Sequence, residues 1–211
     1  MTEQVTDTKT ETPRWGWLYK ISAAAALTAG LLLLVGVIGL IASAVQPSLP
    51  KGWSLLTNNW LVVIFKLHAE YSDVHADALH NLNLLDTVFL LIVGLIGLSL
   101  ATVFTKARRV WSIIVVVLSL LGLVLYFATQ LAGRSTVMIA VLILSLVMLG
   151  NKLFGNVIVY SGILAGILLL LGDLTVGIHS TVITILFGIG YVLLIIWFFL
   201  MARGLVRLSN R

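Results

Sequence analysis

Cysteine is absent from the 211-residue sequence, and only three prolines and eight acidic residues occur in it. Without cysteine the chain has no disulfide, no thiolate metal ligand and no cysteine nucleophile. The prolines (Pro13, Pro47 and Pro50) all precede residue 51, so the remainder contains no residue that would break a helix by lacking its backbone N–H. No Asn-x-Ser/Thr sequence is present, and N-glycosylation is therefore not expected.

Charge is equally scarce, because charged residues make up 10% of the chain while hydrophobic residues make up 60%. A soluble domain has about 25% charged residues, so this chain has too few to solvate its surface. The thirteen basic residues stand singly or in small groups at the ends of apolar blocks. This placement is typical of membrane topology signals and not of a nucleic-acid-binding face, and no nucleic-acid partner is expected.

The apolar residues form six blocks, each a candidate for the roughly 20-residue helix that spans a bilayer. The blocks are Ile21–Val45, Leu84–Phe104, Val110–Leu131, Val137–Leu149, Val157–Leu171 and Thr181–Met201. The prediction is an all-α, polytopic transmembrane helix bundle of about six spans. Residues 1–13 are predicted to be a disordered cytoplasmic tail and residues 14–211 a single bundle. The short connections after residue 105 predict that consecutive helices pack as antiparallel neighbours.

Residues 46–83 form the one long loop, and the apolar stretches at Trp53 and Trp60 predict an interfacial segment or a cap on the outer face. Ala42-Ser43-Ala44 resembles a signal-peptide cleavage site. The preceding apolar block is much longer than the usual 7–15 residues, which favours a retained anchor.

The basic residues also predict the orientation in the membrane. If both termini are cytoplasmic, ten basic residues lie inside, and only Lys51, Lys66 and Arg134 lie outside. The ten are Lys9, Arg14, Lys20, Lys106, Arg108, Arg109, Lys152, Arg203, Arg207 and Arg211. The positive-inside rule favours this orientation, in a plasma membrane, since the reverse one would invert the bias.

Three of the four histidines gather in one thirteen-residue segment, His68–His80. Imidazole and carboxylate side chains are suitable ligands for zinc or another divalent cation. The candidate metal ligands are His68, Asp73, His75, Asp77, His80 and His179. In a helix, His68 and His75 share one face, whereas the set of Asp73, Asp77 and His80 shares another. This division favours the alternative, a solvated polar segment on the outer face.

No Lys, Arg, Asp or Glu is predicted at mid-membrane, which disfavours an ion-driven transporter. The favoured function is a non-catalytic accessory, scaffold or lipid-interacting subunit. Its partners are the lipid bilayer and either another membrane protein or a second copy of the chain. The alternatives are a membrane enzyme or metal-binding protein that uses the outer His/Asp set, and a small transporter or channel. Gly162-x-x-x-Gly166 and Gly97-x-x-x-Ala101 predict close helix packing, by default within the bundle.

The long first outer loop, the tight later hairpins and a last span ending IGYVLLIIWFFLMARGL (189–205) give the chain a characteristic layout. In this layout it resembles small six-span prokaryotic membrane proteins of unknown function. The resemblance implies a prokaryotic plasma membrane and transfers no functional residue.

Overall fold

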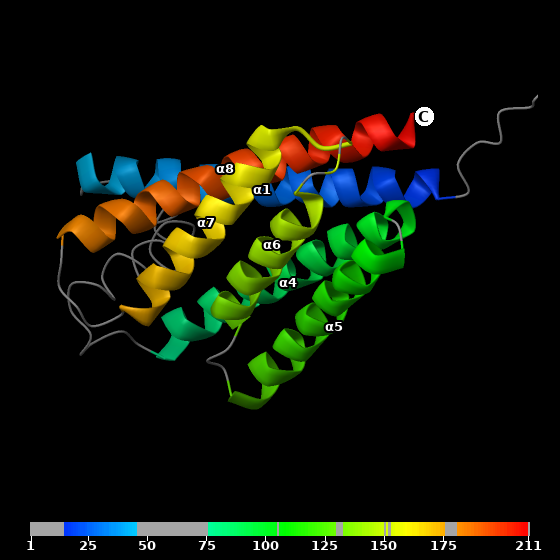
Figure 1. The fold of residues 1–211 in the computed structure, drawn as a ribbon. Helices are drawn as coiled ribbons and strands as arrows, with labels where there is room; N and C mark the ends of the chain where they lie inside the picture. Colours follow the sequence, from blue (N-terminus) through cyan, green and yellow to red (C-terminus); the bar gives the residue numbers. More distant parts are fainter. Residues whose placement is uncertain are drawn as a thin grey trace, which may run out of the picture.

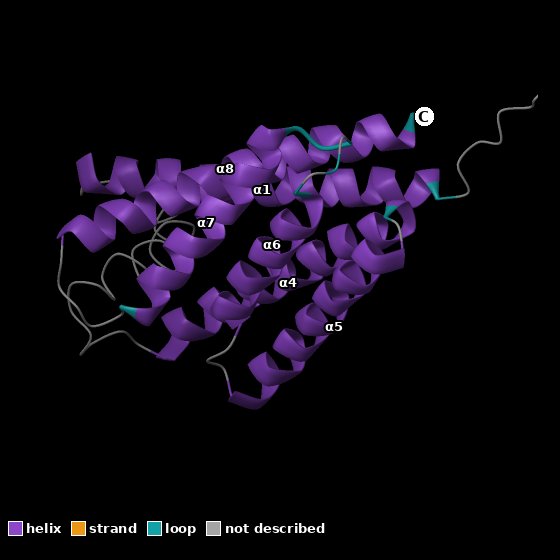
Figure 2. Ribbon diagram, viewed as in Figure 1, coloured by secondary structure: helices purple, strands orange, loops and turns teal. Residues whose placement is uncertain are grey.

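Six α-helices and no β-strand make up the part of the chain that the computed structural model describes, namely residues 15–45, 76–104, 106–129, 133–149, 151, 153–175 and 181–210. The helices are α1 (Gly16–Val45), α4 (Ala76–Val103), α5 (Lys106–Thr129), α6 (Gly133–Met148), α7 (Asn156–Leu174) and α8 (Thr181–Ser209). The prediction of an all-α fold is confirmed for these residues (Figure 2). Each predicted apolar block corresponds to one helix.

The helices alternate in direction, and each of α4 to α7 packs against the helix that follows it. Helix α1 closes the arrangement by lying between α8 and α4, with its most extensive contact to α8. Figure 1 shows that α1 and α8 run antiparallel, so that the start of α1 and the end of α8 lie at the same end of the bundle. We call this the terminal end. The prediction that short connections make consecutive helices neighbours is confirmed for α4 to α8.

The turn between α6 and α7 shows how a short connection reverses the chain. The Asn151 side-chain oxygen accepts a hydrogen bond from the backbone N–H of Leu153 at 3.1 Å, an Asx turn. The backbone N–H of Phe154 donates to the carbonyl of Asn151 at 3.2 Å. The Phe154 ring is buried and meets Phe104 edge to face, with ring centroids 6.2 Å apart. The turn is therefore held against the α4–α5 corner at the terminal end.

The interior is one continuous apolar cluster to which all six helices contribute. Its largest fully buried side chains include Trp197 and Phe198 of α8, whose ring centroids lie 5.1 Å apart in an edge-to-face arrangement. Phe198 also contacts Phe89 of α4, with ring centroids 6.0 Å apart. Helix α8 therefore contributes two large rings to the interior, and it packs mainly against α1 and α7.

Two of the described helices contain stretches long and apolar enough to cross a membrane. They are Gly16–Val35 in α1, with a mean hydropathy of 1.9, and Ile185–Ser209 in α8, with a mean hydropathy of 2.6. Where side chains are described in the other four helices, the apolar stretches are 10–17 residues long. Helices α1 and α8 are thus the candidate membrane spans. The core helix of a soluble protein or a signal sequence satisfies the same criterion, so helix length alone does not establish a six-span bundle.

Candidate functional site

The predicted metal ligands fall outside the part of the structure that can be described. His68, Asp73, His75 and His179 lie beyond the described residues, and Asp77 and His80 are described only as backbone positions in the first turns of α4. Among the side chains that are described, no group of three His, Cys, Asp or Glu could hold a metal ion. The His/Asp site therefore stays a prediction from the sequence.

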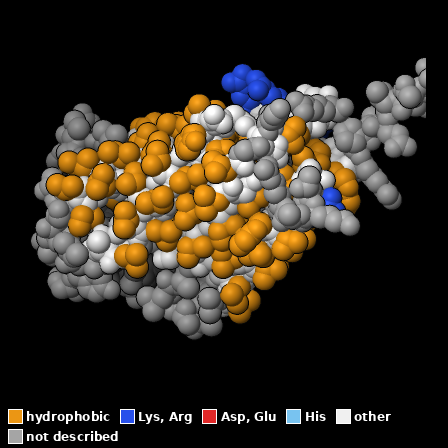
Figure 3. Space-filling model, in the orientation of Figure 1, with side chains coloured by type: hydrophobic (Ala, Val, Ile, Leu, Met, Phe, Trp, Pro, Cys, Tyr) orange, Lys and Arg blue, Asp and Glu red, His pale blue; other side chains and the backbone are white. Residues whose placement is uncertain are grey.

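The described surface is dominated by large apolar side chains, and Figure 3 shows them spread over most of the visible face. On α5, Val110, Trp111, Val117 and Val124 are each more than half exposed. Leu174 at the end of α7 is 81% exposed. Soluble monomers rarely expose a contiguous apolar patch of more than a few hundred Å². A surface of this kind suits an apolar surrounding, such as a bilayer or another protein.

The interior is apolar as well, but it also contains seven buried serine and threonine side chains. They are Ser22, Ser99, Ser112, Ser119, Thr136, Ser145 and Ser161. Several of these hydroxyl groups donate a hydrogen bond to the backbone carbonyl one helical turn earlier. The Ser145 hydroxyl, for example, donates to the carbonyl of Val141 at 2.8 Å. Burying a hydroxyl without such a partner is costly. Helical carbonyls thus allow Ser99, Ser145 and Ser161 to lie between helices, whereas the buried Ser119 hydroxyl has no hydrogen-bond partner in the described part of the chain.

Two hydroxyl pairs connect α1 to α4. The Ser22 and Ser99 hydroxyl oxygens lie 2.5 Å apart, and Ser99 also donates to the carbonyl of Leu95 at 3.1 Å. The Tyr19 and Thr102 hydroxyl oxygens lie 2.7 Å apart. These two pairs, one helical turn apart, fix the rotation of α1 relative to α4. Interhelical hydroxyl pairs of this kind are typical of helix association in membranes.

Glycines allow close approach of helices at the contacts of α7 with α6 and α8 and at the contact of α4 with α5. A Cβ added to Gly162 of α7 would overlap the Ser145 hydroxyl of α6 and the indole nitrogen of Trp197. A Cβ on Gly166 would lie 2.9 Å from Cβ of Leu142, and one on Gly97 would lie 3.3 Å from the Ser112 carbonyl oxygen. The prediction that these glycines serve packing within the bundle is confirmed. The sequence did not show that Trp197 fills the space at Gly162.

The charged side chains that the structure describes are all basic: Lys20, Arg109, Arg203 and Arg207. They lie near the start of α1, the start of α5 and the end of α8, which are the helix ends that meet at the terminal end in Figure 1. The eight acidic residues of the sequence are not among the described side chains. The described part of the bundle therefore has one cationic end and an apolar body.

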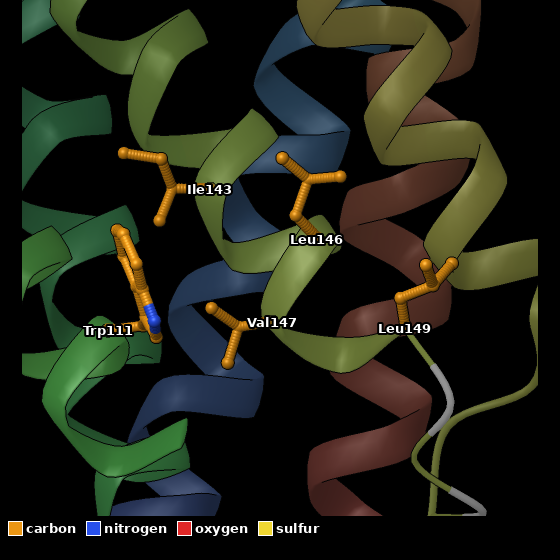
Figure 4. Close-up of a pocket in the computed structure, with 5 residues that line it drawn as sticks. All are labelled: Trp111, Ile143, Leu146, Val147 and Leu149. Carbon is orange, nitrogen blue, oxygen red and sulfur yellow. The ribbon is translucent and has the colours of Figure 1, made fainter. Parts of the chain in front are cut away.

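Two grooves open on this surface. One, of about 400 Å³, lies between α5 and α6, and it is lined by Trp111, Ile143, Leu146, Val147 and Leu149. Trp111 faces Ile143 and Val147 across this groove (Figure 4), and all five lining residues are apolar. The other, of about 490 Å³, lies between α1 and α8 at the terminal end and includes Lys20 and Arg203. Of these two grooves in the described part of the chain, the α1/α8 groove is the one that combines cations with an apolar floor.

In the sequence Lys20 and Arg203 act as orientation signals, and nothing there reveals that they share a groove. A signal for the α1 face alone was present, because Lys20, Ala23, Ala24 and Leu27 follow the spacing of one helix face. What the sequence could not show is that α8 places Arg203 beside this face.

Comparisons with protein-family models, with curated proteins and with solved structures find no match to this chain. The resemblance in layout to small six-span prokaryotic membrane proteins therefore stays a prediction, and the function has to be argued from the side chains of the chain itself.

Proposed function

We propose that the chain is an integral membrane protein with six spans and both termini in the cytoplasm, and that it acts as a non-catalytic accessory, scaffold or lipid-interacting subunit. The observation that carries the proposal is the distribution of side chains. Large apolar residues cover the outside, hydroxyl-bearing residues lie inside, and the described cations lie at one end. A bilayer accounts for all three features together.

The buried hydroxyl groups support a lipid surrounding. Lipid tails are as apolar as leucine, so burying a leucine between helices gains no hydrophobic free energy in a bilayer. Small residues that allow close approach and hydroxyls that pair across helices are then favoured at the interfaces. The Ser22–Ser99 pair and the contacts of Gly162 are of these two kinds.

Helix lengths are compatible with six spans. Helices α4, α5 and α7 contain 28, 24 and 19 residues, and a span needs about 20. Helix α6 has 16 residues, which reach about 24 Å at 1.5 Å per residue. A span shorter than the hydrocarbon core is accommodated by local thinning of the bilayer or by packing against its neighbours. Helix α6 packs against α4, α5 and α7, which is consistent with accommodation by packing against neighbouring helices.

The proposed role follows from where the apolar surface lies. It extends over several helices and offers a large contact area to lipid or to another membrane protein. We infer that the bundle acts through contacts on this surface, with the bilayer as its first partner and a second membrane protein or a second copy of the chain as the other. The cationic end faces the anionic inner leaflet in this orientation.

Single cysteines test the topology directly, because the chain has no cysteine of its own. We expect Gln130→Cys to react with a membrane-impermeant maleimide added to intact cells, since the α5–α6 connection faces outward. We expect Asn151→Cys to react only after the membrane is permeabilised, since the α6–α7 turn faces the cytoplasm. Asn210→Cys at the end of α8 is the matched control for a cytoplasmic site.

A two-span protein with both termini inside would give a different result. Residues between α1 and α8 would then all lie outside, and Asn151→Cys would react in intact cells as readily as Gln130→Cys. That outcome would refute the six-span proposal. Release of the chain from membranes by alkaline carbonate would refute membrane insertion altogether.

A further inference from the structure

The groove between α1 and α8 has two chemically different halves. Its apolar part is formed by Ala23, Ala24 and Leu27 of α1 together with Phe199, Ala202 and Val206 of α8. Its polar part is formed by Lys20, Arg203, Ser209 and Asn210. The three alanines leave space that larger side chains would fill, and this space makes the groove.

The helix register explains why both halves belong to one groove. Lys20, Ala23, Ala24 and Leu27 follow the i, i+3, i+4, i+7 spacing of a single helix face. Phe199, Ala202, Arg203 and Val206 follow the same spacing on α8. Because α1 and α8 run antiparallel, these two faces lie side by side at the terminal end (Figure 1).

The charges of the groove are not balanced by any carboxylate among the described side chains. Lys20 and Arg203 are both exposed, and they stand next to an apolar channel that opens onto the apolar exterior. A ligand that neutralises the two cations and also fills the apolar part of the groove needs an anionic group at one end and a hydrocarbon chain at the other. The α5/α6 groove does not need a ligand with an anionic group, because its lining carries no charge.

We propose that the α1/α8 groove binds one anionic phospholipid from the cytoplasmic leaflet. Lys20 and Arg203 contact its phosphate, and one acyl chain lies over Ala23, Ala24 and Leu27. This inference rests on the proposed membrane function, because a lipid reaches the groove only from a bilayer. It deepens that function by naming the lipid class and the residues that select it.

The experiment measures bound lipid by native mass spectrometry on the full chain, purified in detergent and incubated with phosphatidylglycerol or phosphatidylcholine. We expect the wild-type chain to retain one phosphatidylglycerol in preference to phosphatidylcholine. Lys20→Gln and Arg203→Gln should each lower phosphatidylglycerol retention about fivefold, from the roughly 1 kcal/mol that one cation contributes near an anionic lipid. Inorganic phosphate in excess should not displace the lipid.

Arg207→Gln is the matched control, because it removes the same charge from an exposed position of α8 that does not line the groove. We expect retention in this variant within twofold of the wild type. Ala24→Leu keeps every charge and fills the apolar channel, so it should lower retention of the lipid. All four positions are exposed, and size-exclusion chromatography checks that each variant is folded.

Several outcomes would overturn the proposal. Equal losses for Arg207→Gln and Arg203→Gln would mean that the lipid responds to general surface charge. If the Ala24→Leu variant retained as much phosphatidylglycerol as the wild type, or if inorganic phosphate displaced the lipid, the groove would not contain a site for an acyl chain. Lipid that binds only after residues 1–14 are removed would assign the groove to that segment of the chain and not to a lipid. If the wild-type chain retains no phosphatidylglycerol but its cysteine variants give the expected labelling pattern, only the groove proposal is refuted, whereas a changed labelling pattern refutes the proposed function.

Discussion

Gly162 is a position at which one added methyl group would disturb the packing of α6, α7 and α8 together. In a Gly162→Ala variant the new Cβ would overlap the Ser145 hydroxyl and the indole nitrogen of Trp197, and would lie 2.5 Å from Cδ1 of Trp197. The Ser145 hydroxyl can rotate about its Cα–Cβ bond. The Trp197 ring is fully buried and packs against Phe198, so it can move only if α8 moves with it.

The expected cost follows from two opposing contributions. Forcing an extra methyl group into a packed interior costs about 1–3 kcal/mol. Replacing glycine by alanine within a helix returns up to about 1 kcal/mol. Because the new Cβ would overlap two groups, the cost lies in the upper part of this range, about 2–3 kcal/mol, and the net destabilisation is about 1–2 kcal/mol. For a chain of this length 1 kcal/mol corresponds to about 2–4 °C in Tm, so we expect Tm to fall by about 2–8 °C.

Gly188→Ala is the matched control, because a Cβ at Gly188 of α8 would meet no atom within 4 Å. This variant should be as stable as the wild type or more stable, since only the helix-propensity gain remains. The measurement is the fraction of protein that stays monodisperse on size-exclusion chromatography after heating in detergent. A Gly162→Ala variant with the same Tm as Gly188→Ala would refute the close packing of Trp197 on α7.

Two further predictions test the interior and the exterior of the bundle. A double-mutant cycle of Ser22→Ala and Ser99→Ala should give a coupling free energy of about 0.6 kcal/mol, which is the average for hydrogen-bonded pairs between membrane helices. The coupling is obtained from the unfolding free energies of the wild type, the two single variants and the double variant. If the effects of the two single changes simply add, the hydroxyl pair is contradicted. Val117→Lys places a cation at the exposed middle of α5 and should lower the amount of membrane-inserted protein, because lysine costs about 2.5–3.5 kcal/mol at the centre of a span. Unchanged insertion of this variant, with Val117→Leu as its control, would place α5 outside the bilayer.

The helices could be predicted from the sequence, and their exact starting points could not. The apolar block at Ile21 begins inside a helix that already starts at Gly16, and the block at Leu84 lies inside a helix that starts at Ala76. Hydropathy marks the residues that suit hydrocarbon, whereas helical hydrogen bonding continues into polar residues beyond them. At the start of α1, for example, the Trp15 carbonyl accepts a bond from the N–H of Leu18 at 3.0 Å.

The candidate site was less predictable because it depends on how each helix is rotated. A helix that is apolar on all sides gives no amphipathic signal to indicate its inner face. The sequence therefore identified Lys20 and Arg203 as cations near the membrane surface but did not bring them together. The contact between Gly162 and Trp197 could not be predicted for the same reason, since it joins α7 and α8 through two residues that lie 35 positions apart in the sequence.

Small residues make up most of the buried face of α1 between Tyr19 and Leu33. Ala23, Ala26 and Ala29 are buried, whereas Leu27 and Leu31 of the same helix are each nearly half exposed. Water would favour the reverse, because a buried leucine gains about 1.5–3 kcal/mol and a buried alanine much less. In lipid that gain vanishes, and small side chains are preferred inside because they let two helices approach closely. The same choice leaves α1 and α8 in contact along their length, with the alanine floor of the groove next to the two cations at the terminal end. A bilayer thus explains both why α1 and α8 pack closely and why their groove is open to a lipid.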